Sequence, residues 1–412
     1  MKKVDEFKLA GRTKLILGAQ HVLAMFGSTV LVPFLTGLNP SIALIAAGAG
    51  TLLFHFVTKG KVPAFLGSSF AFIGAIQLVL KNQGISAVKG GVIVAGLIYV
   101  ILAWLVKTYG AAKVTSFLPP VVTGPVIMVI GLRLSPVAIN MAMYKDGAFN
   151  LSYLFVALVV IATMIVVSSL GHSFFRLVPI LISVFVGYLV SAAMGMVNFS
   201  VIGEAKWFGL SADAMRDLTA LPSFSAGAIL AIAPIAIVTF IEHIGDITTI
   251  GAVAGKDFFV DPGVHKTLLG DGLATSLAGL LGGPSNTTYG ENTGVLAVTK
   301  IYDPRVLQIA AVYAIILGLL GKFGVILQTI PTPVMGGISV ILFGMIAAIG
   351  VRMVVDAKLD FSNSRNLLIA ALILVSGIAI NEIAIWQTLS LSGLTIAALV
   401  GIFLNKILPQ DK

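Results

Sequence analysis

The 412-residue chain is predicted to be an all-α polytopic membrane protein. Hydrophobic residues make up 58% of it and charged residues only 10%, whereas about a quarter of a typical soluble domain is charged. The mean hydropathy is +1.05. A water-soluble fold of this size could not cover so much apolar surface, so its solvent is expected to be lipid. Apolar segments of about 20 residues, the length of a membrane-spanning helix, recur along the whole chain.

Fourteen segments have the expected length of spans. They cover residues 14–34, 40–58, 64–82, 89–107, 119–138, 151–169, 177–198, 224–245, 264–282, 285–300, 306–327, 332–350, 366–381 and 388–406. The third, ninth and tenth are weak in hydropathy because they contain Gly, Ser, Thr, Asn and acidic residues. We divide the chain into a tail (1–13), a first repeat (14–198, spans 1–7), an external loop (199–223) and a second repeat (224–406, spans 8–14).

The net charge of +9 is interpreted as membrane topology rather than a nucleic-acid-binding surface. Most of the 26 Lys and Arg residues lie in the N-terminal tail, the even-numbered loops and the C-terminal tail. Basic loops stay in the cytoplasm, which predicts an inner-membrane protein with both termini inside. The chain has no cysteine, which excludes disulfides, thiolate metal sites and thiol catalysis.

Internal repetition predicts two inverted halves. Three motif pairs recur in the same order: Gln20-His21 with Glu242-His243, Ser68-Ser69-Phe70-Ala71 with Thr287-Thr288-Tyr289-Gly290, and the Pro-Gly-rich segments that begin at Pro120 and Pro333. A repeat of seven spans is odd, so its second copy must be upside down in the membrane, as in many secondary transporters. The alternative is that small residues and proline recur in any helical bundle.

Spans 3 and 10 are predicted to be broken helices. Residues 282–294 combine Gly, Pro, Ser, Asn, a Thr pair and Tyr, which are poor helix formers, and residues 61–72 resemble them. Extended backbone at membrane depth must pair internally or line a cavity. We expect the two segments to pair as an antiparallel ladder, each followed by a half-helix whose N-terminus points at a shared site. The alternative is two ordinary helices with polar residues in the bundle.

Four carboxylates lie within predicted spans: Glu242, Asp246, Asp271 and Glu291. Acids inside a membrane are costly and usually mark a solute pathway or proton relay. Glu242 and Asp246 are four residues apart and therefore share a helical face. Asp271 lies between two glycines and could instead serve helix packing.

The tenth span carries a motif that resembles the signature of the nucleobase–ascorbate transporter family, the second nucleobase–cation symporter family. That signature is Gln, Glu or Pro, then Asn-x-Gly-x-x-x-x-Thr, then a basic residue or Gly. It is matched by Glu291, Asn292, Gly294, Thr299 and Lys300. Together with the motifs of spans 1, 3 and 8, the chain looks most similar to the branch of bacterial uracil permeases.

The resemblance implies a core of spans 1–4 and 8–11 and a gate of spans 5–7 and 12–14. It also implies substrate contacts from Glu242, Glu291 and the backbone at Phe70 and Gly290, with Tyr289 nearby. The ring contacts of Phe70 and Tyr289 could equally be packing. Residues expected to support this site are Gln20, Ser69, Ala71, His243 and Asn292, although His243 could be only an interhelical hydrogen-bond partner. Some uracil permeases have His in place of Asp246.

The expected function is uracil uptake by alternating access, with the proton as coupling ion and no other cofactor or metal. Carboxylates can accept hydrogen bonds from the ring N–H groups, and half-helix N–H groups can donate to its carbonyls. Glu242, Asp246 and Glu291 are the candidates for proton coupling. A xanthine or purine symporter and a sulfate or bicarbonate exchanger are the alternatives. An enzyme is not expected, since no HExxH motif is present. The expected partners are a nucleobase and the bilayer; the sequence leaves a homodimer open.

Overall fold

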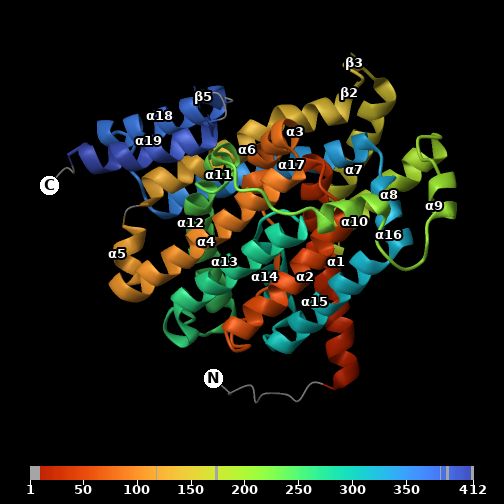
Figure 1. The fold of residues 1–412 in the computed structure, drawn as a ribbon, viewed down its shortest axis with the longest axis horizontal. Helices are drawn as coiled ribbons and strands as arrows, with labels where there is room; N and C mark the ends of the chain where they lie inside the picture. Colours follow the sequence, from red (N-terminus) through yellow and green to blue (C-terminus); the bar gives the residue numbers. More distant parts are fainter. Residues whose placement is uncertain (1–9, 117, 172–174, 381, 387–388, 410–412) are drawn as a thin grey trace.

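The computed structural model describes residues 10–409, except 117, 172–174, 381 and 387–388. The helices form one elongated bundle (Figure 1). The first half contains α1 (Gly11–Thr36), α2 (Pro40–Val57), β1 (Leu66–Ser68), η1 (Phe70–Phe72), α3 (Ile73–Gln83), α4 (Ile85–Tyr109), α5 (Ala111–Thr115), α6 (Pro120–Met143), β2 (Tyr144–Lys145), β3 (Ala148–Phe149), α7 (Leu151–Leu170), η2 (Phe175–Leu177) and α8 (Pro179–Ala193). Two short helices, α9 (Ser200–Glu204) and α10 (Ala212–Thr219), lie in the loop between the halves.

The second half continues with α11 (Ala226–Ile232), α12 (Ile235–Ala254), η3 (Phe259–Gly263), α13 (Val264–Leu281), β4 (Asn286–Thr288), α14 (Gly290–Thr299), α15 (Pro304–Leu319), α16 (Gly321–Gln328), α17 (Thr332–Asp356), α18 (Ser364–Ala379), β5 (Glu382–Trp386), β6 (Leu389–Ser392) and α19 (Gly393–Ile407). The predicted polytopic helical fold, with short strands in the third and tenth segments, is confirmed.

Among the described residues, seven helical segments are long and apolar enough to cross a membrane. They are α1, α2, α4, α6, α7, α11 with α12, and α17. Helices α15 and α16 meet at 79° and would make an eighth if they count as one span. The other candidates are half-helices or shorter helices, so the count of fourteen stays a prediction.

The two broken segments pair with each other at the centre of the fold. Strands β1 and β4 are antiparallel, with Leu66 opposite Thr288 and Ser68 opposite Asn286. All six paired residues are buried. Their backbone groups are satisfied by the ladder and by flanking bonds such as Tyr289 N–H to the Phe65 carbonyl at 2.9 Å, which is how extended backbone is tolerated at membrane depth. The antiparallel pairing is the one that an inverted repeat predicts.

Polar side chains fix this strand pair to the surrounding helices. The Asn286 amide donates to the Ala46 carbonyl of α2 at 3.1 Å. The Thr275 hydroxyl of α13 donates to the Asn286 carbonyl at 2.9 Å, and the Thr51 hydroxyl of α2 accepts from the Leu66 N–H at 2.9 Å. Three buried polar side chains therefore hold the strands in one register.

The helices pack in two sets. Helices α1 to α4 pack with α11 to α15, most extensively through α4 with α13 and α2 with α15. Helices α6 to α8 pack with α17 to α19, chiefly through α6 with α17. Small residues allow the close approach of α6 and α17: a Cβ on Gly131 would lie 2.3 Å from the Phe343 carbonyl oxygen.

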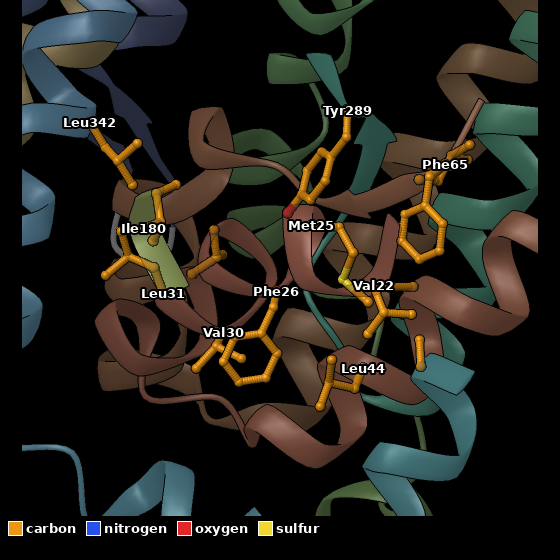
Figure 2. Close-up of a cluster of buried hydrophobic side chains, with 14 of the residues drawn as sticks. Val22, Met25, Phe26, Val30, Leu31, Leu44, Phe65, Ile180, Tyr289 and Leu342 are labelled. Carbon is orange, nitrogen blue, oxygen red and sulfur yellow. The ribbon is translucent and has the colours of Figure 1, made fainter. Parts of the chain in front are cut away.

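A hydrophobic cluster surrounds the strand pair (Figure 2). Met25 and Leu31 of α1, Leu44 of α2 and Phe65 are completely buried, and Tyr289 is 4% exposed. The cluster joins segments that are far apart in the sequence, since Ile180 of α8 and Leu342 of α17 belong to it as well. This packing holds the strands and the half-helices that follow them in place.

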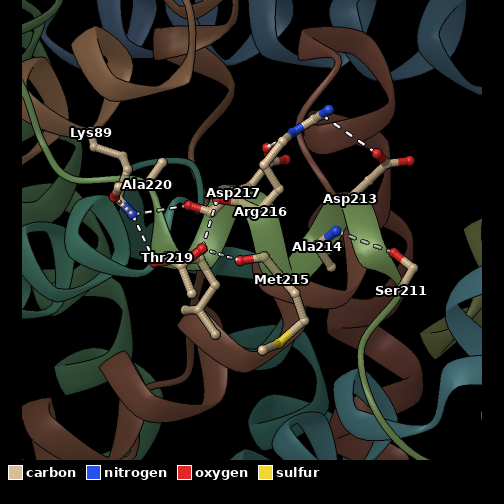
Figure 3. Close-up of polar contacts among 10 residues, drawn as sticks. Lys89, Ser211, Asp213, Ala214, Met215, Arg216, Asp217, Thr219 and Ala220 are labelled. Atoms are coloured by element: carbon tan, nitrogen blue, oxygen red, sulfur yellow. Dashed lines mark hydrogen bonds and ion pairs between the residues drawn. The ribbon is translucent and has the colours of Figure 1, made fainter.

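The loop predicted over residues 199–223 is ordered against the ends of several helices (Figure 3). Lys89 of α4 is 1% exposed, and its ammonium group donates to the carbonyls of Asp217, Leu218 and Ala220 at 2.6 to 3.0 Å. These carbonyls terminate α10, where a cation is favourable. The Ser211 hydroxyl caps the other end by accepting from the Ala214 N–H.

Candidate functional site

Helix α12 presents two carboxylates on one exposed face. Glu242 is exposed and Asp246 is half-buried, although both lie within a membrane-spanning helix. Between them Gly245 has open space where a side chain would begin. A carboxylate inside a span faces the bundle interior or a water-filled cavity. This face of α12 is therefore expected to line a space that water reaches.

Glu291 lies across from this face in the first turn of α14. Gly290, which precedes it, has open space beside it, and Tyr289 is the extended N-cap residue. The Ser28 hydroxyl of α1 donates to Glu291 Oε1 at 2.5 Å, which fixes the carboxylate and leaves its second oxygen for another donor. The position is favourable for a negative charge, because the N-terminus of a helix carries a partial positive charge.

The strand pair connects the two acidic elements. The Thr288 hydroxyl of β4 donates to Asp246 Oδ2 at 2.9 Å. Since Thr288 is two residues before Gly290, this bond fixes α12 relative to the start of α14. Glu242 and Asp246 interact electrostatically with each other, with Glu291 and with the buried Asp271 of α13. The structure thus brings together the three acids that the sequence predicted for the site.

The predicted aromatic residues have different surroundings. The Tyr289 hydroxyl donates to the Ser68 carbonyl at 2.9 Å and accepts from the Thr29 hydroxyl at 3.3 Å. Its ring is buried against Gly67, so in this conformation Tyr289 supports the strand pair from behind. Phe70 is half-buried, and its ring meets Phe343 of α17 edge to face at 6.5 Å between centroids. Phe70 therefore touches the second set of helices.

His243 and Asp271 form a pair behind the acidic face. His243 Nδ1 lies 3.0 Å from Asp271 Oδ2 of α13, and its Nε2 lies 2.9 Å from the Thr267 hydroxyl. Both side chains are completely buried. The pair joins α12 to α13 and does not reach the open space beside Glu242.

The other predicted supporting residues lie at the half-helix starts and on α1. The Asn292 amide donates to the His21 carbonyl at 3.0 Å and lies 3.1 Å from His21 Nδ1, which ties α14 to α1. Ser69 and Ala71 are buried at the start of the first half-helix. Gln20 is half-buried on α1, next to His21.

Sequence reasoning missed Ser28, Thr29 and Thr288 as partners of the site. Ser28 and Thr29 are two hydroxyl residues in an otherwise apolar part of span 1. Such residues are common in the interfaces of membrane helices, so they carried no specific signal. Their position about two turns beyond Gln20-His21 in the same span could have suggested them.

The open face of α12 continues toward the helix end. A surface cavity of about 300 Å³ is lined there by Thr248, Ala252, Lys256 and Phe258 among others. It lies beyond Glu242 in the direction of the α12 C-terminus, not at the acids themselves. In the described part of the chain, no group of three or more His, Asp or Glu side chains is arranged to hold a metal ion.

Comparison with known proteins decides the family. The model of the permease family matches residues 12–384. The uracil permease of Bacillus subtilis (strain 168) is 45% identical over 399 residues, covering 95% of this chain and 92% of that protein. The uracil permease of Bacillus caldolyticus is 46% identical over 395 residues, with 95% and 91% covered. The chain belongs to the permease family. The resemblance to nucleobase–ascorbate transporters is thereby confirmed, and the protein is a membrane transporter and not an enzyme.

Solved structures with the same fold are more distant in sequence. The transmembrane domain of a cyanobacterial bicarbonate transporter, BicA, superposes with a TM-score of 0.65 at 16% identity, covering 95% of this chain and 96% of that one. The murine anion transporter Slc26a9, in its inward-facing state, has a TM-score of 0.72 at 13% identity, with 98% and 69% covered. At these identities the similarity shows that the permease has the same fold as these proteins, and it does not show a common substrate.

Proposed function

We propose that this permease imports uracil together with protons by alternating access. The observation that carries the proposal is the meeting of three carboxylates with the starts of two half-helices at one buried strand pair. Uracil is neutral and flat, and it has two N–H donors and two carbonyl acceptors. The carboxylates accept from the N–H groups, and the backbone N–H groups at Phe70 and Gly290 donate to the carbonyls. The names of the two bacillary relatives support the choice of uracil.

The supporting residues position this chemistry. Ser28 fixes one oxygen of Glu291, and Thr288 fixes one oxygen of Asp246. Each acid keeps an oxygen for the base or for a proton. A base that lacks one N–H or carbonyl would leave a buried group without a partner, and this is how the site rejects similar molecules.

The same three acids suit proton coupling. Ionised carboxylates repel one another strongly in a low-dielectric space. Protonation of one of them lowers this repulsion and thereby favours binding of the base. Glu242 is the leading candidate because its side chain is exposed in the open space. Among the described residues, no side chain fixes it by a hydrogen bond in the way that Ser28 fixes Glu291. Asp246 would relay the proton.

The two packing sets support a core of spans 1–4 and 8–11 and a gate of spans 5–7 and 12–14. The core carries every acid of the site, and the gate contacts Phe70 through Phe343. The proposed location is the inner membrane, with both termini in the cytoplasm. In this topology the exposed half of α12 opens to the inside, so the site is accessible from the cytoplasm in this conformation.

An anion exchanger is not favoured, although anion transporters share the fold. Glu242, Asp246 and Glu291 would repel sulfate or bicarbonate at the place where the half-helices meet. A purine or xanthine symporter would use the same donors and acceptors. Competition between labelled uracil and unlabelled xanthine separates these two substrates.

The test is uptake of radiolabelled uracil into proteoliposomes with and without an inward proton gradient. Wild-type protein should accumulate uracil only with the gradient. Glu242→Gln can still hydrogen-bond the base but cannot release a proton, so it should keep part of the exchange of uracil across the membrane and lose accumulation. Lys81→Gln, at an exposed helix end, is the control. If Glu242→Gln accumulates uracil as the wild type does, then Glu242 is not the coupling residue.

A further inference from the structure

Large apolar side chains are exposed in the loop between the two halves, around the short helix α9. Phe199, Trp207 and Phe208 are 56%, 68% and 75% exposed, and Val201 of α9 is 46% exposed. Single exposed apolar residues are common on any protein, but these four lie within one stretch of the loop and form a patch. We call residues 199–208 the aromatic segment. Its apolar surface indicates contact with something other than water.

The aromatic segment is bound to the bend between α15 and α16. The Gly209 N–H donates to the Leu319 carbonyl at 2.9 Å, and the Gly321 N–H donates to the Trp207 carbonyl at 3.0 Å. The two backbones are so close that a Cβ on Gly321 would lie 2.6 Å from the Lys206 carbonyl oxygen. Helix α9 also packs against α16, and Figure 1 shows the two side by side. The depth of the segment in the membrane therefore follows from the depth of the bend.

The bend lies near one boundary of the hydrocarbon layer. Helix α15 has 16 residues and is therefore about 24 Å long, which is most of a hydrocarbon core of about 30 Å. It begins after Asp303, which forms a 2.9 Å ion pair with Lys14 near the start of α1. Leu319 is at the opposite end of the helix, at the other membrane surface. The bend of 79° then directs α16 along that surface and not across the bilayer.

The exposed face of α15 leads directly to the aromatic segment. Val312, Ile316 and Leu319 are 44 to 48% exposed, and their spacing of four and three residues places them on one face of the helix. An apolar face that a membrane helix leaves unpacked meets lipid. Since the Leu319 carbonyl bonds to Gly209, the aromatic segment continues this face at its end. Aromatic side chains are favoured at that level, where hydrocarbon meets the headgroups.

Two lysines accompany the aromatic side chains. Lys206 is exposed, and Lys322 Nζ of α16 lies 4.5 Å from the centroid of the Trp207 ring, a cation–π contact that holds the indole against α16. Ammonium groups and the indole N–H are donors without an acceptor, so they suit the phosphate and ester oxygens of phospholipids. Glu204 is the one acid of the aromatic segment. With two lysines beside it, the patch is positive and complements the phosphates.

We propose that the aromatic segment and α16 form a phospholipid-binding surface, which anchors the loop between the halves in the membrane interface. Phe199 and Phe208 contact the acyl chains next to the headgroups, and Trp207 lies at the level of the ester groups. Lys206 and Lys322 extend to the phosphates. Apolar aromatic side chains below lysines are typical of segments that lie in the plane of the interface. The inference is independent of the solute that the permease carries.

Tryptophan fluorescence tests this contact, because the chain has only three tryptophans. Trp104→Phe together with Trp386→Phe leaves Trp207 as the single fluorophore. The protein is reconstituted in phosphatidylcholine whose acyl chains carry bromine, a contact quencher, either near the headgroup or near the methyl end. We expect bromine near the headgroup to lower the fluorescence of Trp207 about twofold or more, and bromine near the methyl end to lower it less. Iodide in the water should quench Trp207 weakly.

The controls separate lipid contact from simple exposure. Arg216→Trp, with the three natural tryptophans replaced by Phe, places the fluorophore at a side chain of α10 that is 73% exposed, and it should be quenched by iodide and not by bromine. Gly321→Ala pushes the segment from the bend and should reduce bromine quenching of Trp207, whereas Gly74→Ala, into open space, should not. Quenching of Trp207 by iodide alone means a loop in water, and quenching by neither agent means a protein contact, such as a second copy; each result overturns the inference. If Gly321→Ala does not fold, the depth profile and the α10 control decide.

Discussion

Replacing Glu291 by Gln tests the site at the residue whose surroundings are best defined. Its carboxylate accepts a hydrogen bond from Ser28 at 2.5 Å and has a second oxygen available for the base. A glutamine would keep its carbonyl oxygen toward Ser28, because the hydroxyl is a donor there. Its amide N–H₂ would then face the ring N–H of uracil, donor against donor.

The magnitude follows from this geometry. The mutation removes one hydrogen bond between the base and a charged group, which contributes about 1.5–3 kcal/mol. Since 1.4 kcal/mol corresponds to a factor of ten, the Kd for uracil should rise about 10- to 150-fold. The fold should be kept, because glutamine has the same shape and retains the contact to Ser28. Ser28→Ala removes only the support of the carboxylate and should raise the Kd about 2- to 10-fold.

The assay is uracil binding to detergent-solubilised protein by calorimetry or scintillation proximity, with the melting temperature of each variant measured in the same detergent. The control variant is Gly74→Ala, which adds a methyl group where no other atom lies within 4 Å. A Kd for Glu291→Gln within threefold of wild type, with an unchanged melting temperature, would remove Glu291 from the site. A larger effect of Ser28→Ala than of Glu291→Gln would refute the orientation argued above.

Two further predictions concern the scaffold. Gly67→Ala would place its Cβ 2.4 Å from Tyr289 Cζ, so we expect the free energy of unfolding to fall by about 1–3 kcal/mol and uracil binding to weaken, both measured against Gly74→Ala. Lys89→Met leaves three part-buried carbonyls without their donor and should cost about 1–3 kcal/mol locally. Faster hydrogen exchange over α10 would reveal this cost, with Lys81→Met as the matched control; unchanged exchange would mean that other contacts hold the loop.

The sequence predicted the parts of the fold that depend on local composition. Polar, helix-breaking residues at 282–294 indicated an extended segment, and the need to satisfy its backbone in lipid predicted a pairing with residues 61–72. Strands β1 and β4 confirm that pairing, with Leu66 opposite Thr288. The loop helices α9 and α10 were not predicted, because each is too short to show a helical period.

The contacts within the site were harder to predict because they join distant parts of the chain. Ser28 and Glu291 are 263 residues apart, and their bond depends on the crossing of α1 and α14. A serine in an apolar span has the same sequence signal whether it supports a carboxylate or packs between helices. The acids could be chosen from sequence because a charge in a span is rare, whereas their hydroxyl partners are common residues.

The placement of Glu291 also explains how one fold can provide a binding site for an anion or for a neutral base. A half-helix that begins at membrane depth directs free N–H groups and a partial positive charge at the site, and by itself this favours an anion. In this permease the first turn of α14 carries its own carboxylate, held by Ser28 and joined by Asp246 through Thr288 of the preceding strand. The positive helix end is thus balanced from within the protein. What remains at the strand pair is a set of acceptors beside backbone donors, which matches a neutral ring with both kinds of group at its edge.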